Sequence, residues 1–121
     1  MELLKIEFTG FSDRWVEAVM PVTPYHLQPE GVVHGGALLA LAETVGSAGS
    51  FLLVDPATTQ VYGSSVSGQH LSPAREGVLK ARAVLLVRAD FKHIWDVEIR
   101  NEQGKLISIS RVTNSVKPKT R

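Results

Sequence analysis

The sequence predicts an α+β domain in which one long, apolar helix is wrapped by a curved antiparallel β-sheet. The 121 residues are enough for one domain and too few for two. Residues 31–54 contain a single acidic residue and no basic residue, which is typical of a buried helix, whereas the segments on either side favour strands. A helix that is apolar on most sides must be covered on most sides, and one curled sheet of long strands covers it in this way.

Two short strands precede the helix. Residues 3–9 and 14–20 show a loose alternation of apolar and polar side chains, and the residues between them are turn formers. The chain then carries three prolines, which exclude a long helix or a central strand at this point: Pro21, Pro24 and Pro29.

The helix carries two stripes of side chains. The first is apolar and consists of Leu38, Leu41, Val45, Ala48 and Leu52. The second consists of small side chains and one acidic side chain: Gly36, Ala40, Glu43, Ser47 and Ser50. Gly46 and Gly49 each cost about 1 kcal/mol relative to Ala inside a helix, so we expect another element to approach the backbone closely there. Asp55 and Pro56 end the helix.

Four further strands follow, which gives the order β-β-α-β-β-β-β. The predicted ranges are residues 60–71, 78–89, 93–100 and 105–116, with a hairpin turn at residues 101–104. If Arg100 lies opposite Lys105, Leu106 faces the helix, and a set of aliphatic side chains faces outward: Val84, Leu86, Ile94, Ile107 and Ile109. Residues 117–121 are expected to be a frayed tail of the single domain 1–121.

Composition and charge exclude several classes of protein. The hydrophobic share of 44% and charged share of 21% indicate a folded domain, and the absence of cysteine excludes a disulfide scaffold and a thiolate nucleophile. Residues 1–74 contain two basic and seven acidic residues, whereas residues 75–121 contain eleven basic and five acidic residues. The basic half either serves a phosphorylated ligand or forms solvated strand faces on which Lys80 and Arg82 pair with Asp96 and Glu98.

No nucleic acid, membrane or metal partner is expected. The pI of about 8.1 lies below that of most nucleic-acid-binding domains. Glu43 at the centre of the apolar segment and the lack of flanking Lys or Arg argue against a membrane span. No pair of His and acidic residues has metal-ligand spacing, and no His completes a triad with a Ser. The N-terminal residues lack the basic start and apolar run of a signal peptide, so we expect a cytoplasmic protein.

The first candidate site is residues 28–36, which end in His34-Gly35-Gly36 where the helix begins. Two glycines there leave backbone N–H groups uncovered, and the helix N-terminus adds partial positive charge. Together these groups form an oxyanion hole for a carbonyl oxygen. The alternative is a tight loop-to-helix turn with His34 as a capping or packed side chain. Of the other histidines, His26 is expected to be solvated and His93 to be a hydrogen-bonded core residue.

Glu43 is the second candidate. A lone carboxylate on a buried helix is costly, and burial raises its pKa and suits it to act as a base or nucleophile. The alternative is a carboxylate capped by Ser47 one turn later. Glu43 lies about 10–12 Å along the helix from Gly35 and Gly36, which is too far for one side chain to close. If these groups share one carbonyl, the carboxylate comes from an antiparallel helix of a second copy, so we expect a twofold dimer with shared sites. Gly46 and Gly49 would then allow the two helices to approach closely.

The segment HGGALLALAETVGS, with Glu43 nine residues after His34, resembles the hotdog-fold acyl-CoA thioesterases. It is most similar to the 4-hydroxybenzoyl-CoA thioesterase branch, which has a catalytic Glu on the central helix. That branch includes phenylacetate-pathway, enterobactin-proofreading and dihydroxynaphthoyl-CoA thioesterases. The resemblance covers nearly the whole chain, and it implies the hotdog fold.

The resemblance also implies roles for individual residues. Glu43 matches the general base or nucleophile, and the Gly35 N–H matches the group that polarises the thioester carbonyl. Gln28 and His34 match residues that hold the thioester or position water, and Ser47 matches the hydroxyl one turn beyond the Glu.

Further residues match the substrate contacts of relatives. Gly63, His70 and Ser72 fall where relatives contact the substrate or the coenzyme A arm, although some relatives have Arg in place of Ser72. Arg88 and Lys92 fall in the loop where relatives grip the nucleotide phosphates, and this loop lacks the glycine of those relatives.

The predicted function is therefore hydrolysis of an aryl or medium-chain acyl-CoA thioester to the free acid and coenzyme A. No cofactor is expected, because coenzyme A is part of the substrate. The alternatives are an acyl-CoA-binding domain without catalysis, which would lack the acid, and a hotdog dehydratase, which would need a His–Asp or His–Glu pair elsewhere. The resemblance and the outward aliphatic side chains together predict a dimer of dimers.

Overall fold

The computed structural model describes residues 5–29 and 31–119, so the parts of the predictions that fall on residues 3, 4, 30, 120 and 121 lie outside it. The described chain contains one α-helix, α1 (Gly35–Leu53), and a short 3₁₀ helix, η1 (Pro24–His26). The strands within these residues are β1 (Glu7–Phe11), β2 (Trp15–Pro21), β3 (Thr59–His70), β4 (Val78–Arg88), β5 (Lys92–Arg100) and β6 (Leu106–Pro118). The predicted element order is thus observed.

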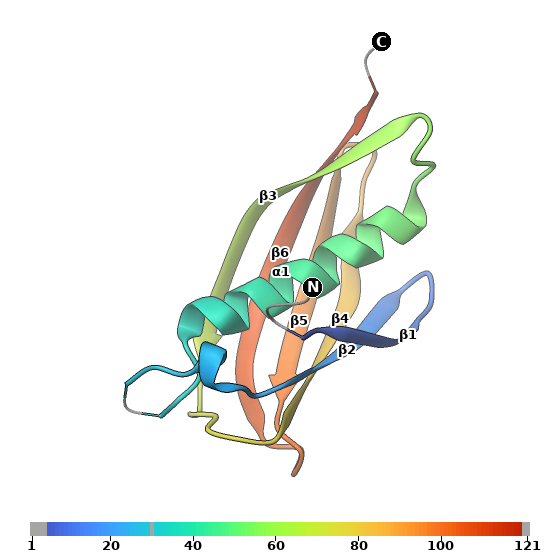
Figure 1. Ribbon diagram of the computed structural model, residues 1–121. Coiled ribbons are helices and arrows are strands. Elements are labelled where there is room, and N and C mark those ends of the chain that lie inside the picture. Colours follow the sequence, from blue (N-terminus) through green and yellow to red (C-terminus); the bar gives the residue numbers. More distant parts are fainter. Residues whose placement is uncertain (1–4, 30, 120–121) are drawn as a thin grey trace.

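The strands form one antiparallel sheet in the order β1-β2-β4-β5-β6-β3. The sheet curves around α1, which crosses its concave face (Figure 1) and contacts every strand from β2 to β6. This arrangement is the hotdog fold, and it confirms the predicted fold class. β3 lies at one edge of the sheet, and only one of its sides is paired within the described chain.

The core lies between α1 and the sheet. Leu38, Leu41 and Val45 of α1 are buried against the inward faces of the strands. The inward positions alternate along the sequence as predicted, and they include Leu79, Ala81, Ala83, Trp95, Val97 and Ile99. Burial of each large apolar side chain contributes about 1.5–3 kcal/mol. By length and composition α1 is also apolar enough to cross a membrane, but its buried residues pack on the sheet.

The helix glycines face the sheet and not a second helix, which corrects one expectation. A Cβ on Gly46 would lie 2.9 Å from Val112, and a Cβ on Gly49 would lie 2.4 Å from the Trp95 ring. Real Cβ atoms do not come this close to other heavy atoms. The two glycines therefore allow α1 to lie directly on β5 and β6, and the close approach that the sequence predicted is an intrachain contact.

Three local expectations were wrong. The register of β5 and β6 shifts between Ile99 and Arg100, so Arg100 pairs with Leu106, and Ile107 is in the core instead of on the outer face. His26 is buried, and its Nδ1 accepts a hydrogen bond from the Thr23 N–H. β6 continues to Pro118 and the following Lys119 N–H donates to the Thr58 carbonyl, so residues 117–119 are held to the sheet and not frayed.

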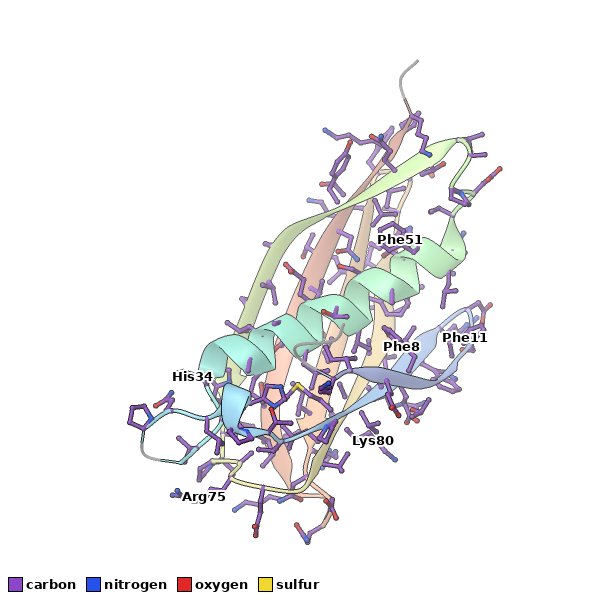
Figure 2. The ribbon with its side chains drawn as sticks, viewed as in Figure 1. Phe8, Phe11, His34, Phe51, Arg75 and Lys80 are labelled. Atoms are coloured by element: carbon purple, nitrogen blue, oxygen red, sulfur yellow. The ribbon has the colours of Figure 1, made fainter. Side chains whose placement is uncertain are left out.

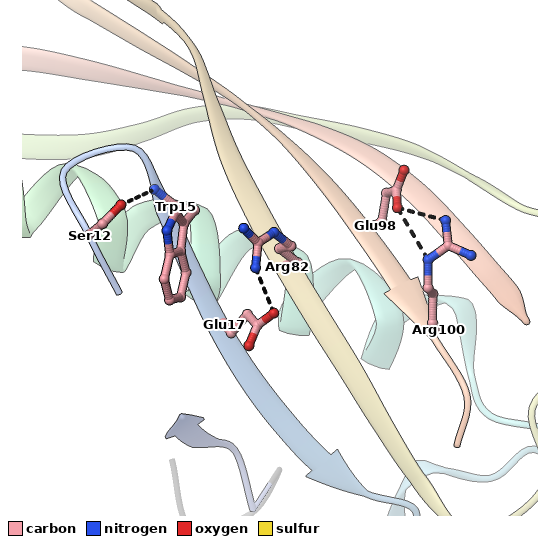
Figure 3. A network of polar contacts seen from close by, with 6 residues as sticks. All are labelled: Ser12, Trp15, Glu17, Arg82, Glu98 and Arg100. Carbon is pink, nitrogen blue, oxygen red and sulfur yellow. Dashed lines mark hydrogen bonds and ion pairs between the residues drawn. The ribbon is translucent and has the colours of Figure 1, made fainter. Parts of the chain in front are cut away.

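Ion pairs occupy much of the outer face of the sheet. Arg82 pairs with Glu17 of the neighbouring strand at 2.8 Å and stacks on the Trp15 ring (Figure 3), instead of pairing with an acid on β5. Arg100 pairs with Glu98, and Asp96 pairs with Arg111. Solvent screening keeps the contribution of such exposed pairs to stability small. Several basic residues of the C-terminal half are thus solvated strand residues with acidic partners.

We expect Gly49→Ala to destabilise the protein, although Ala is the better helix former. The added methyl group meets the buried Trp95 ring, and overpacking of this kind costs about 1–3 kcal/mol against a helix-propensity gain of about 1 kcal/mol. Gly36→Ala is the matched control, since beyond its chain neighbours and the nearby backbone of α1 no atom of the described residues lies within 4 Å of its Cβ position. Denaturant unfolding measures both changes; equal stability of the two variants would contradict the close packing of Gly49.

Candidate active site

Several predicted site residues meet in a cavity at the start of α1. The cavity has a volume of about 280 Å³, and its lining includes Gln28, Gly35, His70 and Ser72. These residues come from three separate parts of the chain: the loop before α1, the first residue of α1, and the end of β3 with the segment after it. The prediction that they belong to one site is therefore consistent with their positions.

Backbone hydrogen bonds hold the loop that carries Gln28. The Gln28 N–H donates to the Val32 carbonyl, and the Gly31 N–H donates to the Gln28 carbonyl. Gly31 has a φ of 81°, a left-handed conformation that glycine adopts without strain. The Val33 N–H then donates to the Ala74 carbonyl, which ties the loop to the segment after β3 and closes one wall of the cavity.

Gly35 brings the helix N-terminus against His70. A Cβ on Gly35 would lie 2.8 Å from the His70 Nε2, so a larger residue would displace this imidazole. The first N–H groups of a helix have no intrahelical acceptor, and the N-cap residue His34 gives them no side-chain hydrogen bond. The N–H groups at the start of α1 therefore remain suited to a carbonyl oxygen or an anion.

The His34 side chain lies outside this cavity lining. It is exposed at the start of α1 (Figure 2), and its backbone N–H donates to the carbonyl of the buried His26. His34 therefore orders the chain before the helix through its backbone and presents its imidazole at the surface.

Glu43 belongs to a second cluster. It is exposed, so the expectation that Glu43 is buried within one copy of the chain was wrong. Its Oε2 lies 3.5 Å from the Cβ position of Gly63 on the edge strand β3. This is an ordinary van der Waals distance, so the Glu43 carboxylate lies beside β3 at Gly63. Ser47, one helical turn later, is half-buried and donates a long hydrogen bond of 3.4 Å to the Asn114 Oδ1.

A buried polar network lies behind this second cluster, and the sequence pattern did not predict all of its members. Ser50 Oγ is within hydrogen-bond distance of His93 Nδ1, Trp95 Nε1 and Asn114 Nδ2, at 2.8, 2.9 and 2.8 Å. All four side chains are buried, so His93 is the hydrogen-bonded core residue that the sequence predicted. The signal for Asn114 was an amide at an inward position of the last strand, between Val112 and Val116.

The two clusters do not meet within one chain. Gly35 and Glu43 are eight residues apart on α1, which corresponds to about 12 Å along the axis. The structure thus keeps the separation that the sequence analysis anticipated. In a single copy, the backbone N–H of Gly35 and the carboxylate of Glu43 are therefore too far apart to act on one carbonyl group.

Arg88 and Lys92 lie near the opposite end of α1, about 27 Å from Gly35 along the helix axis. Arg88 Nη2 donates to the Leu53 carbonyl in the last turn of α1 at 3.2 Å. Its positive charge therefore complements the negative end of the helix dipole. Arg88 also lines a second cavity, of about 470 Å³, with Asp90 and Phe91 of the adjoining loop, whereas Lys92 is exposed at the start of β5. Among residues 5–29 and 31–119, no group of three or more His, Asp or Glu side chains is placed to hold a metal ion.

Comparison with known proteins identifies the family. The model of the thioesterase superfamily matches residues 30–108, which include the whole of α1 and both clusters except Gln28 and Asn114. The chain therefore belongs to the thioesterase superfamily, and its class of activity is thioester hydrolysis.

Individual relatives cover almost the whole chain. A 1,4-dihydroxy-2-naphthoyl-CoA hydrolase of Escherichia coli is 34% identical over 113 residues, which are 93% of this chain and 82% of the relative. A thioesterase structure from Haemophilus influenzae has a TM-score of 0.91 and 39% identity, and covers 97% of this chain and 81% of that one. A thioesterase structure from Staphylococcus aureus has a TM-score of 0.94 and 34% identity, with 97% of each chain covered.

His93 makes the stability of the fold sensitive to pH. Burial, followed by the nearby Arg88 charge, lowers the pKa of His93 below the ordinary value of 6.5. Below about pH 6.5 the unfolded chain therefore binds a proton at this residue that the folded chain does not. We expect the free energy of unfolding to fall as pH decreases through this range, by at most about 1.4 kcal/mol per pH unit.

Denaturant unfolding between pH 5 and pH 8 measures this effect. His93→Gln is the matched variant, since it keeps a polar side chain beside Ser50 and removes the titration. The free energy of unfolding of this variant is expected to vary less with pH than that of the unmodified protein. If the free energy of unfolding varied with pH equally in the two proteins, His93 would not be a cause of the pH dependence.

Proposed function

We propose that this thioesterase hydrolyses an aryl or medium-chain acyl-CoA to the free acid and coenzyme A. The observation that carries the proposal is the cavity at the start of α1, where Gln28, Gly35, His70 and Ser72 surround an uncapped helix N-terminus. In the proposed mechanism the Gly35 N–H donates to the thioester carbonyl oxygen as negative charge develops on it. Donors of this kind contribute about 3–4 kcal/mol to stabilisation of the transition state.

Glu43 is the proposed general base or nucleophile. Its carboxylate is the acidic group of α1, and it lies beside Gly63 with Ser47 one turn away. As a base it takes a proton from the attacking water, and as a nucleophile it forms an anhydride that water then hydrolyses. In either case Gln28 and His34 are proposed to hold the thioester or the water, and His70 and Ser72 to contact the substrate.

The proposed active site lies between two copies of the chain. The separation of Gly35 and Glu43 calls for a second copy, and the edge strand β3 offers a surface for it. β3 has 12 residues, contains no Lys, Asp, Glu or Pro, and presents unpaired backbone groups along one side. Twofold pairing along β3 sets the two copies of α1 antiparallel and brings Glu43 of one copy towards Gly35 of the other.

The same assembly accounts for the proposed coenzyme A contacts. An antiparallel partner helix that sets its Glu43 opposite Gly35 extends its C-terminal end, with Arg88 and Lys92, about 15 Å beyond Gly35. These cations are proposed to hold the nucleotide phosphates. The outer face still exposes Val84, Leu86 and Ile109, so a second dimer is proposed to cover it.

A hydrolysis screen tests the substrate class. Benzoyl-CoA, 4-hydroxybenzoyl-CoA and hexanoyl-CoA are incubated with the protein, and the free thiol is detected as it is released. Turnover of at least one of them supports the proposal. Binding without turnover would favour the acyl-CoA-binding alternative, and loss of water from a 3-hydroxyacyl-CoA would favour the dehydratase.

We expect Glu43→Gln to lower kcat by about 10²–10⁴-fold, because the amide keeps the shape of the side chain but neither accepts a proton nor attacks a thioester. Glu43→Asp is also expected to be poor, since the carboxylate retracts by one methylene. Glu7→Gln is the matched control: the same change at an exposed position of β1. Steady-state kinetics with the best substrate of the screen measures the effect, and near-normal turnover by Glu43→Gln would exclude the proposed role.

Mixing two inactive variants tests the shared site. Glu43→Gln removes the carboxylate, and Gly35→Pro removes the N–H and displaces His70, so each variant alone is expected to be inactive. In a mixed dimer one site receives both intact groups, and random exchange restores about a quarter of the full activity. Absence of recovery after confirmed subunit exchange would exclude a site shared in this way, as would a fully active monomer in sedimentation.

A further inference from the structure

Asn114 links the buried network to the cluster around Glu43. It lies on β6, is fully buried, and pairs with Gly63 of β3, the strand residue beside the Glu43 carboxylate. Its side chain makes three hydrogen bonds to α1, at Gly46, Ser47 and Ser50.

The orientation of the Asn114 amide follows from its partners. Nδ2 lies 3.3 Å from the Gly46 carbonyl, which only accepts hydrogen bonds, so the NH₂ group must be on this side. The second proton of Nδ2 is directed to Ser50 Oγ at 2.8 Å. The amide oxygen is then left facing the Ser47 hydroxyl.

The proton of Ser50 is fixed by the same reasoning. A hydroxyl has one proton and two lone pairs. Trp95 Nε1 and Asn114 Nδ2 only donate, so they use both lone pairs, and Ser50 must donate its own proton to His93 Nδ1. His93 is therefore neutral with its proton on Nε2. Reversal of the Asn114 amide would break hydrogen bonds throughout this buried network.

We propose that Asn114 is a positioning residue of the active site, which fixes the direction of the Ser47 hydroxyl. Ser47 donates to the Asn114 oxygen, so only its lone pairs remain for a molecule beside Glu43. The cluster therefore offers two acceptors one helical turn apart, and it selects a group that donates hydrogen bonds, such as water or a hydroxyl. This role rests on the proposed function of Glu43 and Ser47.

A double-mutant cycle separates this role from simple support of the fold. Asn114→Leu is of similar size and removes the acceptor for Ser47, and we expect it to lower kcat about tenfold with little change in KM. In the Ser47→Ala background, where no hydroxyl remains to be directed, the same substitution is expected to lower kcat by less than about twofold. Ser110→Ala, a buried serine on the same face of β6, is the matched control and should lower kcat equally little in both backgrounds.

Asn114→Ala, which also removes the acceptor for Ser47, is the second variant if Asn114→Leu does not fold. Thermal unfolding of each protein establishes that it is folded before its kinetics are compared. The positioning role would be overturned if Asn114→Leu lowered kcat by the same factor with Ser47 present and with Ser47→Ala, or if it left kcat unchanged. Either result would leave the proposed function intact. Failure of both Asn114 variants to fold would assign the residue to folding alone. If the unmodified protein cleaves no thioester of the panel, the proposed function fails and this role fails with it.

Discussion

The contact of α1 with the inner face of the sheet determines the rest of the structure. Gly46 and Gly49 have no side chains, so the helix backbone lies directly on Val112 and Trp95. This short separation brings Ser50 within hydrogen-bond distance of three residues on β5 and β6. It also sets the start of α1 against the end of β3, where Gly35 meets His70. Both clusters of the candidate site are therefore placed by one packing constraint.

The polar groups on the two sides of α1 differ in whether the same chain provides hydrogen-bond partners for them. The side that faces the sheet is satisfied by protein partners, since every hydrogen-bonding atom of Ser50 has one. The side that carries Glu43 is exposed, and its carboxylate lies over an unpaired strand edge. Burial of a carboxylate without partners is costly, and an exposed position avoids that cost in the single copy. In the proposed assembly, a second copy along β3 would change the surroundings of Glu43.

Much of the fold followed from the sequence because its signals are local. Alternation along β5, and along β4 as far as Leu85, gave the correct inward faces, and the apolar run with Asp55-Pro56 after it located α1. Ile107 could not be placed, because an irregularity in the register reverses the face of a strand residue without changing the hydrophobic pattern. The direction in which Gly46 and Gly49 face was also missed, since a glycine indicates close approach but does not identify the neighbour. Likewise, His26 lies in a proline-rich loop whose burial depends on contacts distant in sequence.

The candidate site was predictable to the extent that its residues are adjacent in sequence. His34, Gly35, Glu43 and Ser47 share one helix, so their spacing could be derived from the helical rise alone. The meeting of Gln28, His70 and Ser72 at Gly35 came from resemblance, because three chain segments form that cavity. Asn114 had no local signal beyond a polar residue at an inward strand position, and its importance emerges only when the proton donors of the network are assigned.

The two ends of α1 show why the candidate site is at its start. At the C-terminal end the Arg88 guanidinium donates a hydrogen bond to the Leu53 carbonyl, so a positively charged side chain of the protein stabilises the negative end of the helix dipole. At the N-terminal end His34 gives no side-chain cap, and Gly35 has no side chain to cover the backbone. Ser, Thr, Asp or Asn at the N-cap would stabilise the helix by about 1 kcal/mol. A helix that lacks this cap, in a cavity lined by Gln28 and His70, retains its first N–H groups as hydrogen-bond donors for a ligand.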